Sequence, residues 1–139
     1  MGLGNLFGGP KYAALAEDSS EARQIAQSAA FESFVKVAND RIEVVPGEDA
    51  LFAFVGKPPK AFGIVWFFGD ERRDVPTMVR HGIVTRESAA RLAEDLRGIY
   101  EANTSVTRFE HRVAGHRVVV APSEQMHAEI RKALEHAAS

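Results

Sequence analysis

The segment Ala61–Phe68, with the sequence AFGIVWFF, constrains the fold most, because it is almost entirely apolar. A strand with apolar side chains on both faces must be covered on both, so we expect it in the interior of a sheet. Two further strand-like runs precede it, Arg41–Val45 and Ala50–Val55. Proline and glycine residues end each of them, which is typical of turns between strands.

Helical spacing flanks this group of strands. Residues Ala22, Ile25, Ala26 and Ala29 follow Ser20 and Glu21 at positions i, i+3, i+4 and i+7, which predicts a helix. We expect it to continue through about Ala38, although Ser33–Val37 also alternates as a strand would. A second helix begins at Thr85, ends near Asn103 and carries one apolar stripe. A last helix opens at Pro122-Ser123.

Two more strands, Ser105–Val113 and His116–Ala121, separate the last two helices. Pro76 and Gly82 weaken any regular structure over Asp74–Val84, where a short strand around Thr77–Arg80 stays open. The order is therefore α-β-β-β-α-β-β-α. We expect an α+β fold, with an antiparallel sheet of about five strands and helices packed mainly on one face. Residues 1–10 are expected to be a flexible segment, and residues 11–139 a single domain.

Composition excludes several classes of function. The 17 basic residues nearly balance the 19 acidic ones, which argues against a dedicated nucleic-acid binder. The absence of cysteine excludes disulfides, thiolate nucleophiles and cysteine-based metal sites. No apolar run approaches the roughly 18 residues that a membrane span needs, and no signal-peptide pattern opens the chain. We expect a cytoplasmic protein.

Catalytic motifs are also missing. Gly56-Lys57 is followed by Pro58, where a phosphate-binding loop needs Ser or Thr. No Gly-x-Ser-x-Gly elbow occurs. The sequence therefore favours a protein that is not an enzyme, and it indicates no cofactor.

Two histidines, His111 and His116, flank a predicted hairpin turn, and their geometry depends on its register. A two-residue Ala114-Gly115 loop places both imidazoles on one face, as diagonal neighbours that a metal ion can bridge. A type I turn with Gly115 as a bulge residue places them on opposite faces. Hydrophobic patterning favours the first register, and turn chemistry favours the second. One hypothesis is therefore a small-ligand or metal site at these histidines, with His81 as a third polar group.

Arginine is unevenly placed, since nine of the twelve lie between Arg72 and Arg117. In the first register Arg108, Arg112 and Arg117 share the face opposite the histidines. A guanidinium cluster of this kind can bind phosphate or carboxylate, which gives a second hypothesis of an anion or RNA binder. Six acidic residues in the same window argue for a charge-balanced surface instead.

The order of elements resembles the plan of type III secretion chaperones, which are small homodimers that bind unfolded segments of other proteins. The resemblance lies in element order over most of the chain, and no sequence motif accompanies it. The chain is also rich in phenylalanine, with more such residues than one small core needs: Phe31, Phe34, Phe52, Phe54, Phe62, Phe67 and Phe68. The favoured hypothesis is a homodimeric binding or adaptor module that also takes a protein partner.

Overall fold

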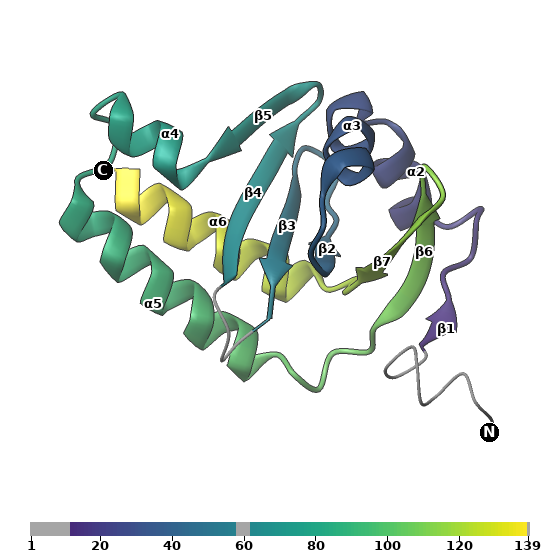
Figure 1. Ribbon diagram of the computed structural model, residues 1–139. Helices are drawn as coiled ribbons and strands as arrows, with labels where there is room; N and C mark the ends of the chain where they lie inside the picture. Colours follow the sequence, from purple (N-terminus) through teal and green to yellow (C-terminus); the bar gives the residue numbers. More distant parts are fainter. Residues whose placement is uncertain (1–11, 58–61, 139) are drawn as a thin grey trace.

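The computed structural model describes residues 12–57 and 62–138, which form one mixed sheet with helices on both faces (Figure 1). The seven strands lie in the order β1-β6-β7-β2-β3-β4-β5. Their bounds are Ala13–Ala14 (β1), Ile42–Val45 (β2), Leu51–Gly56 (β3), Phe62–Phe68 (β4), Glu71–Asp74 (β5), Phe109–Val113 (β6) and His116–Val120 (β7). The helices are Ser20–Ala26 (α2), Ala29–Val37 (α3), Val75–Arg80 (α4), Arg86–Ala102 (α5) and Glu124–Ala138 (α6).

The predicted α+β class is confirmed, but the predicted antiparallel sheet of about five strands is wrong. Strand β6 pairs with β1 and strand β7 pairs with β2, both in parallel, so the sheet is mixed. The two extra strands lie at its edges. Strand β1 is only 2 residues long, and every residue of β5 is charged, so neither carries the apolar alternation that reveals a strand.

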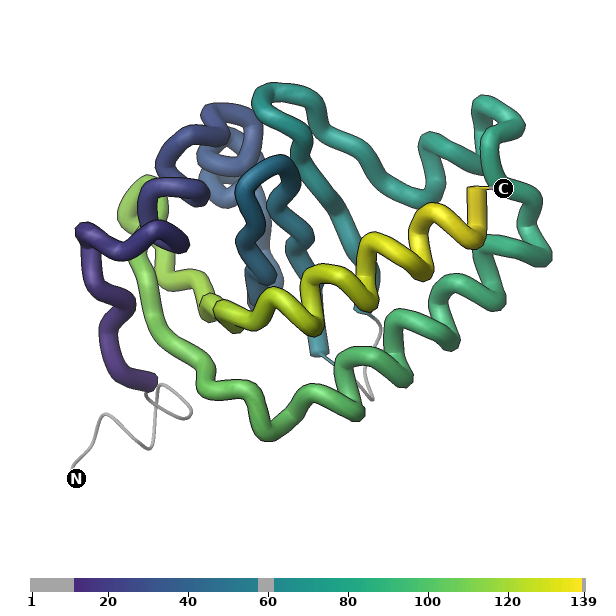
Figure 2. Tube along the Cα trace, turned by 180° about the vertical axis from the view of Figure 1, so that it is seen from behind, coloured from purple at the N-terminus to yellow at the C-terminus, as the bar shows by residue number. Residues whose placement is uncertain are grey.

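The parallel pairing follows from the path of the chain between the two groups of strands. After β5 the chain crosses one face of the sheet through α4 and α5, and it returns at the far side as the β6–β7 hairpin (Figures 1 and 2). Strand β7 then meets the free side of β2 rather than a strand adjacent in sequence. Local turn signals report only pairing between sequence neighbours, so the sequence does not reveal this contact.

The predicted placement of the helices mainly on one face is also wrong, because the two faces form separate cores. Side chains of α2 and α3 pack on one face, while those of α5 and α6 pack on the other. Strand β4 supplies both cores, with Val65 and Phe67 toward α3 and Ile64 and Trp66 toward α5 and α6. This explains why its sequence is apolar throughout.

The two cores together also bury most of the phenylalanine side chains whose number exceeds the need of one small core. Phe31, Phe52, Phe54 and Phe67 are fully buried. Phe34, Phe62 and Phe68 are half-buried. Among the described residues the large exposed apolar side chains are Val37 and Ile83, which lie on different elements. The expected surplus is therefore confined to the half-buried rings.

The segment expected to be one helix through Ala38 forms two. Ser28 interrupts it, because its hydroxyl accepts a hydrogen bond from the backbone N–H of Phe31 and caps α3. The same hydroxyl donates to the carbonyl of Gly69, which ties α3 to the β4–β5 turn. The strand alternative for this segment is excluded, since Ala29–Val37 is helical.

The open question over Asp74–Val84 resolves as helix α4. The side chain of Asp74 accepts from the backbone N–H of Thr77, and Pro76 lies in the first helical turn. None of the helices in the described part of the chain is long and apolar enough to cross a lipid bilayer. The N-terminal segment 1–10 lies outside the described residues.

Candidate functional site

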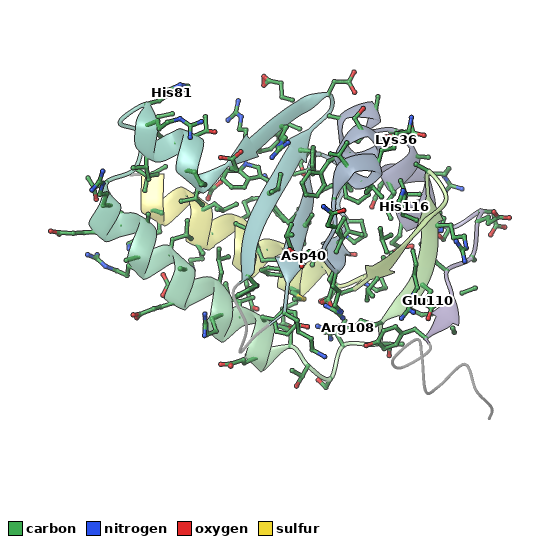
Figure 3. The ribbon with its side chains drawn as sticks, in the orientation of Figure 1. Lys36, Asp40, His81, Arg108, Glu110 and His116 are labelled. Carbon is green, nitrogen blue, oxygen red and sulfur yellow. The ribbon has the colours of Figure 1, made fainter. Side chains whose placement is uncertain are left out.

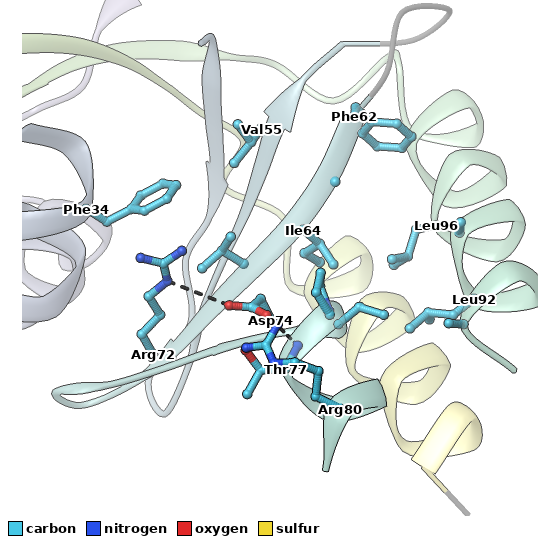
Figure 4. A pocket seen from close by; sticks show the side chains of 16 residues that line it. Phe34, Val55, Phe62, Ile64, Arg72, Asp74, Thr77, Arg80, Leu92 and Leu96 are labelled. Carbon is cyan, nitrogen blue, oxygen red and sulfur yellow. Dashed lines mark hydrogen bonds and ion pairs between the residues drawn. The ribbon is translucent and has the colours of Figure 1, made fainter. Parts of the chain in front are cut away.

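A groove of about 510 Å³ opens at the β4 edge of the sheet, between α3, α4 and α5 (Figure 4). Cavities of this size are typical of ligand sites. Its lining is mainly apolar and comes from both faces of the sheet. The apolar members are Phe34, Val55, Phe62, Gly63, Ile64, Val65, Val75, Pro76, Ala89, Leu92, Ala93 and Leu96.

Small residues keep this groove open. A Cβ atom built on Gly63 would meet no atom within 4 Å, so the strand offers empty space where other residues carry a side chain. Across the groove, α5 presents Ala89 and Ala93 one turn apart. Leu92 and Leu96 lie beside them and are anchored in the core, at 2% and 4% exposure. Within the described residues, two buried leucines thus hold α5 in place beside a space that no side chain of Gly63 fills.

The floor of the groove is a strand edge without a partner. Strand β4 pairs with β3 from Phe62 onward, but β5 covers its other side only from Val65, opposite Asp74. Within the described residues no strand pairs with this side of Phe62, Gly63 and Ile64. Backbone groups left unpaired at a strand edge are ready to bond another chain.

The direction of these backbone groups follows from one hydrogen bond. The N–H of Gly56 donates to the carbonyl of Arg41 at 2.8 Å, so Gly56 bonds toward β2. Bonding direction alternates along a strand, hence Val55 bonds toward β4 and its partner Gly63 toward β3. The N–H of Ile64 and the carbonyl of Phe62 therefore point into the open edge.

Four polar residues lie at the foot of the groove, where β5 leads into α4: Arg72, Asp74, Thr77 and Arg80 (Figure 4). Burial alone would raise the pKa of Asp74, but hydrogen bonds from Thr77 and the charges of Arg72 and Arg80 outweigh it and hold that pKa below its usual value. Two guanidinium groups thus surround one carboxylate. The foot of the groove carries a net positive charge.

Among the described residues, these two arginines keep hydrogen-bond donors free for a ligand. Arg80 uses one nitrogen to donate to the Thr77 hydroxyl at 3.0 Å. Arg72 lies 3.9 Å from a carboxylate oxygen of Asp74, which is too long for a hydrogen bond, and its guanidinium stacks over the Phe34 ring. Arg72 is 51% exposed, so its donors face solvent.

The β6–β7 hairpin adopts the first of the two registers that the sequence leaves open. Val113 pairs with His116, and His111 pairs with Val118, so both imidazoles lie on one face. The two-residue turn holds Ala114 at φ 52° and Gly115 at φ 80°. The hydrophobic pattern thus outweighs the strain that alanine accepts in a left-handed conformation.

The third candidate, His81, lies at the end of α4, on the opposite side of the molecule from His116 (Figure 3). In the described part of the chain no three His, Asp or Glu side chains are grouped to hold a metal ion. The structure brings His111 and His116 together and leaves His81 apart.

The three arginine candidates also lie in different environments. Arg108 is buried and donates to the Glu43 carboxylate through Nε at 3.2 Å and through a terminal nitrogen at 2.9 Å. Its remaining nitrogen donates to the carbonyls of Asn103 and Val106. All of its nitrogens are engaged inside the fold.

The other two arginines of this group are exposed. Arg112 donates to the Gly115 carbonyl, and Arg117 forms an ion pair with Glu110 at 3.4 Å. The three do not form one open anion site, because Arg108 is directed into the sheet toward Glu43.

Glu43 is fully buried, and it binds Arg41 at 2.9 Å as well as Arg108. The hydroxyl of Tyr100 donates to the same carboxylate over 3.4 Å. Burial, followed by the Glu43 charge, raises the pKa of Tyr100. The group ties β2 to α5 and to Arg108, the residue that precedes β6.

Sequence reasoning missed the groove residues Gly63, Arg72 and Arg80. One signal was present: Asp74 followed by Pro76 is typical of a helix start, which would have ended β5 at Asp74. No local pattern places α5 beside the open edge of β4. No family model, curated protein or solved structure matches the chain. The expected resemblance to type III secretion chaperones has no support from these comparisons.

Proposed function

We propose that this protein is a non-enzymatic peptide-binding module that adds an extended segment of a partner protein to the open edge of β4. The observation that carries the proposal is the unpaired stretch Phe62–Ile64 at the floor of an apolar groove. Strand addition of this kind uses backbone hydrogen bonds for affinity and side-chain pockets for specificity. The unpaired backbone groups of Phe62–Ile64 and the apolar lining of the groove support this mode of binding.

The open edge favours a peptide over a compact small molecule. The Ile64 N–H and the Phe62 carbonyl need hydrogen-bonding partners at strand spacing, which a polypeptide backbone supplies. The three open residues correspond to roughly 10 Å of strand at about 3.3 Å per residue. An added segment of three or four residues fits this length.

The test is a selection from two display libraries of random peptides about eight residues long. One library carries the random segment at free carboxyl termini, and the other carries it within a longer chain. We expect the wild-type protein to enrich sequences with alternating apolar residues in at least one library. Enrichment of no peptide, or of peptides that bind equally well when the groove is filled, would contradict the proposal.

The groove is filled by Gly63→Val. The backbone of Gly63 is not in a left-handed conformation, and the new side chain enters empty space. Valine is favoured in strands, so we expect a free energy of unfolding equal to that of the wild type or up to about 1 kcal/mol higher. Peptide binding should nevertheless fall at least tenfold.

The matched control is Gly98→Ala on α5. Its Cβ also meets nothing within 4 Å, and Gly98 does not line the groove. Alanine should stabilise the helix by up to about 1 kcal/mol. Peptide affinity should stay at the wild-type value.

The homodimer expected from the sequence is a separate part of the proposal. Native mass spectrometry of the purified protein measures it, with a mass twice that of the chain as the expected result. A single-chain mass at micromolar concentration would leave peptide binding to the monomer.

A further inference from the structure

We infer that the groove takes the free carboxyl terminus of its partner, as a short strand parallel to β4, with the terminal carboxylate between Arg72 and Arg80. This inference rests on the proposed peptide-binding function. It adds which end of the peptide binds and in which direction the peptide runs.

An added strand must end inside the groove. A segment beside Phe62–Ile64 occupies the same position relative to β4 that β5 occupies from Val65 onward. It is therefore collinear with β5. The end of the added segment that lies nearer Val65 meets the junction of Asp74 and Val75, where β5 leads into α4 (Figure 4). A polypeptide in this position terminates at that junction.

The charge at the junction selects which terminus of the peptide lies there. Arg72 and Arg80 outnumber Asp74 at the junction, and Asp74 already caps α4 by accepting from Thr77 at 2.9 Å. A carboxylate brought to this point gains two guanidinium groups, which match it in charge and in the geometry of their donors. A terminal ammonium would meet a net positive charge instead.

The direction of such a peptide also fits the free backbone groups of β4. A peptide whose carboxyl end lies toward β5 runs parallel to β4, because β4 also runs from Phe62 toward its β5-paired half. In a parallel pair one residue bonds to both sides of the residue opposite it. A peptide residue opposite Gly63 thus donates to the Phe62 carbonyl and accepts from the Ile64 N–H, the two groups that point outward.

The test uses a peptide enriched by the wild-type protein, synthesised both as the free acid and as the carboxyl-terminal amide. Fluorescence anisotropy gives the Kd of each form. We expect the free acid to bind at least tenfold more tightly than the amide. We also expect the double variant Arg72→Gln, Arg80→Gln to remove that difference by weakening the acid form alone.

The matched control is Arg73→Gln. Arg73 lies between the two on β5, but its guanidinium stacks over Phe68 and pairs with Glu71, outside the groove lining. This variant should keep the full difference between acid and amide.

The outcomes separate the two proposals. Equal affinities of acid and amide, together with loss of binding in Gly63→Val, overturn the carboxylate inference and leave strand addition standing. Enrichment from the internal library alone overturns it as well. If neither peptide form depends on Gly63→Val, both proposals fail.

Discussion

Replacing Arg108 with methionine should remove a large part of the stability of this fold. The arginine makes two hydrogen bonds to Glu43, at 3.2 and 2.9 Å, and one each to the carbonyls of Asn103 and Val106, at 2.6 and 2.8 Å. Glu43 has 0% exposure and is then left with Arg41 and Tyr100. Breaking a buried ion pair by removing one partner costs about 3–5 kcal/mol. Domains of this kind have only about 5–15 kcal/mol in total.

Urea unfolding followed by circular dichroism measures this loss of free energy. In a separate thermal unfolding experiment the melting temperature should fall by about 10 °C. Arg112→Met is the matched control, since Arg112 is exposed and its hydrogen bond in the described part of the chain runs across its own turn, to Gly115. Its cost should stay within about 0.5 kcal/mol. The double variant Glu43→Met, Arg108→Met removes the buried carboxylate as well, and we expect it to recover at least 1 kcal/mol, on the order of typical coupling energies. A loss below about 1 kcal/mol in Arg108→Met would refute the structural role and would return Arg108 to the list of anion-binding candidates.

Three further changes test other parts of the structure. Ala114→Gly relieves the positive φ of 52° in the β6–β7 turn, so the free energy of unfolding should rise by about 0.5–1 kcal/mol in urea titrations; a decrease would contradict the turn geometry. Gly47→Ala places a Cβ against Nε2 of the buried His127, whose ring donates to the Ala50 carbonyl at 3.0 Å. It should cost about 1–3 kcal/mol in the same assay, and an unchanged midpoint would refute this packing. Because the fold lowers the pKa of Asp74, its carboxylate contributes stability that is fully present above its unfolded pKa of about 4 and is lost as the pH falls through the lower, folded value. The stability difference between wild type and Asp74→Asn should therefore shrink between about pH 5 and pH 2; a difference that grows on acidification would contradict the sign of that pKa shift.

The sequence predicts those elements whose apolar side chains follow a regular pattern of burial. The apolar run of β4, the stripe of α5 and the β6–β7 register all follow from burial patterns, and the structure confirms them. Strand β5 is not predicted, because the sequence of an edge strand with four charged residues is indistinguishable from that of a loop. No sequence pattern discussed above marks His127 as buried, yet Gly47, which carries no side chain, leaves room for its ring in the core.

The candidate site is less predictable than the fold. The groove exists because β5 ends after Asp74 while β4 extends to Phe62, and because α5 returns beside that gap. These are relations between segments far apart in the sequence, and no local pattern encodes them. Of the residues that the sequence singles out, Arg108 is held by the buried Glu43, and His111 and His116 lie on one face of the β6–β7 hairpin.

Strand addition at β4 is tested most directly by amide hydrogen exchange of Ile64, measured by NMR with and without a saturating selected peptide. The Ile64 N–H points into the groove, whereas the N–H of Gly63 bonds within the sheet and serves as the internal reference. The proposal predicts that the peptide slows exchange at Ile64 at least tenfold and changes Gly63 little. Exchange at Ile64 that is unchanged by a bound peptide would show that the peptide binds elsewhere or without pairing, and it would contradict the proposed function.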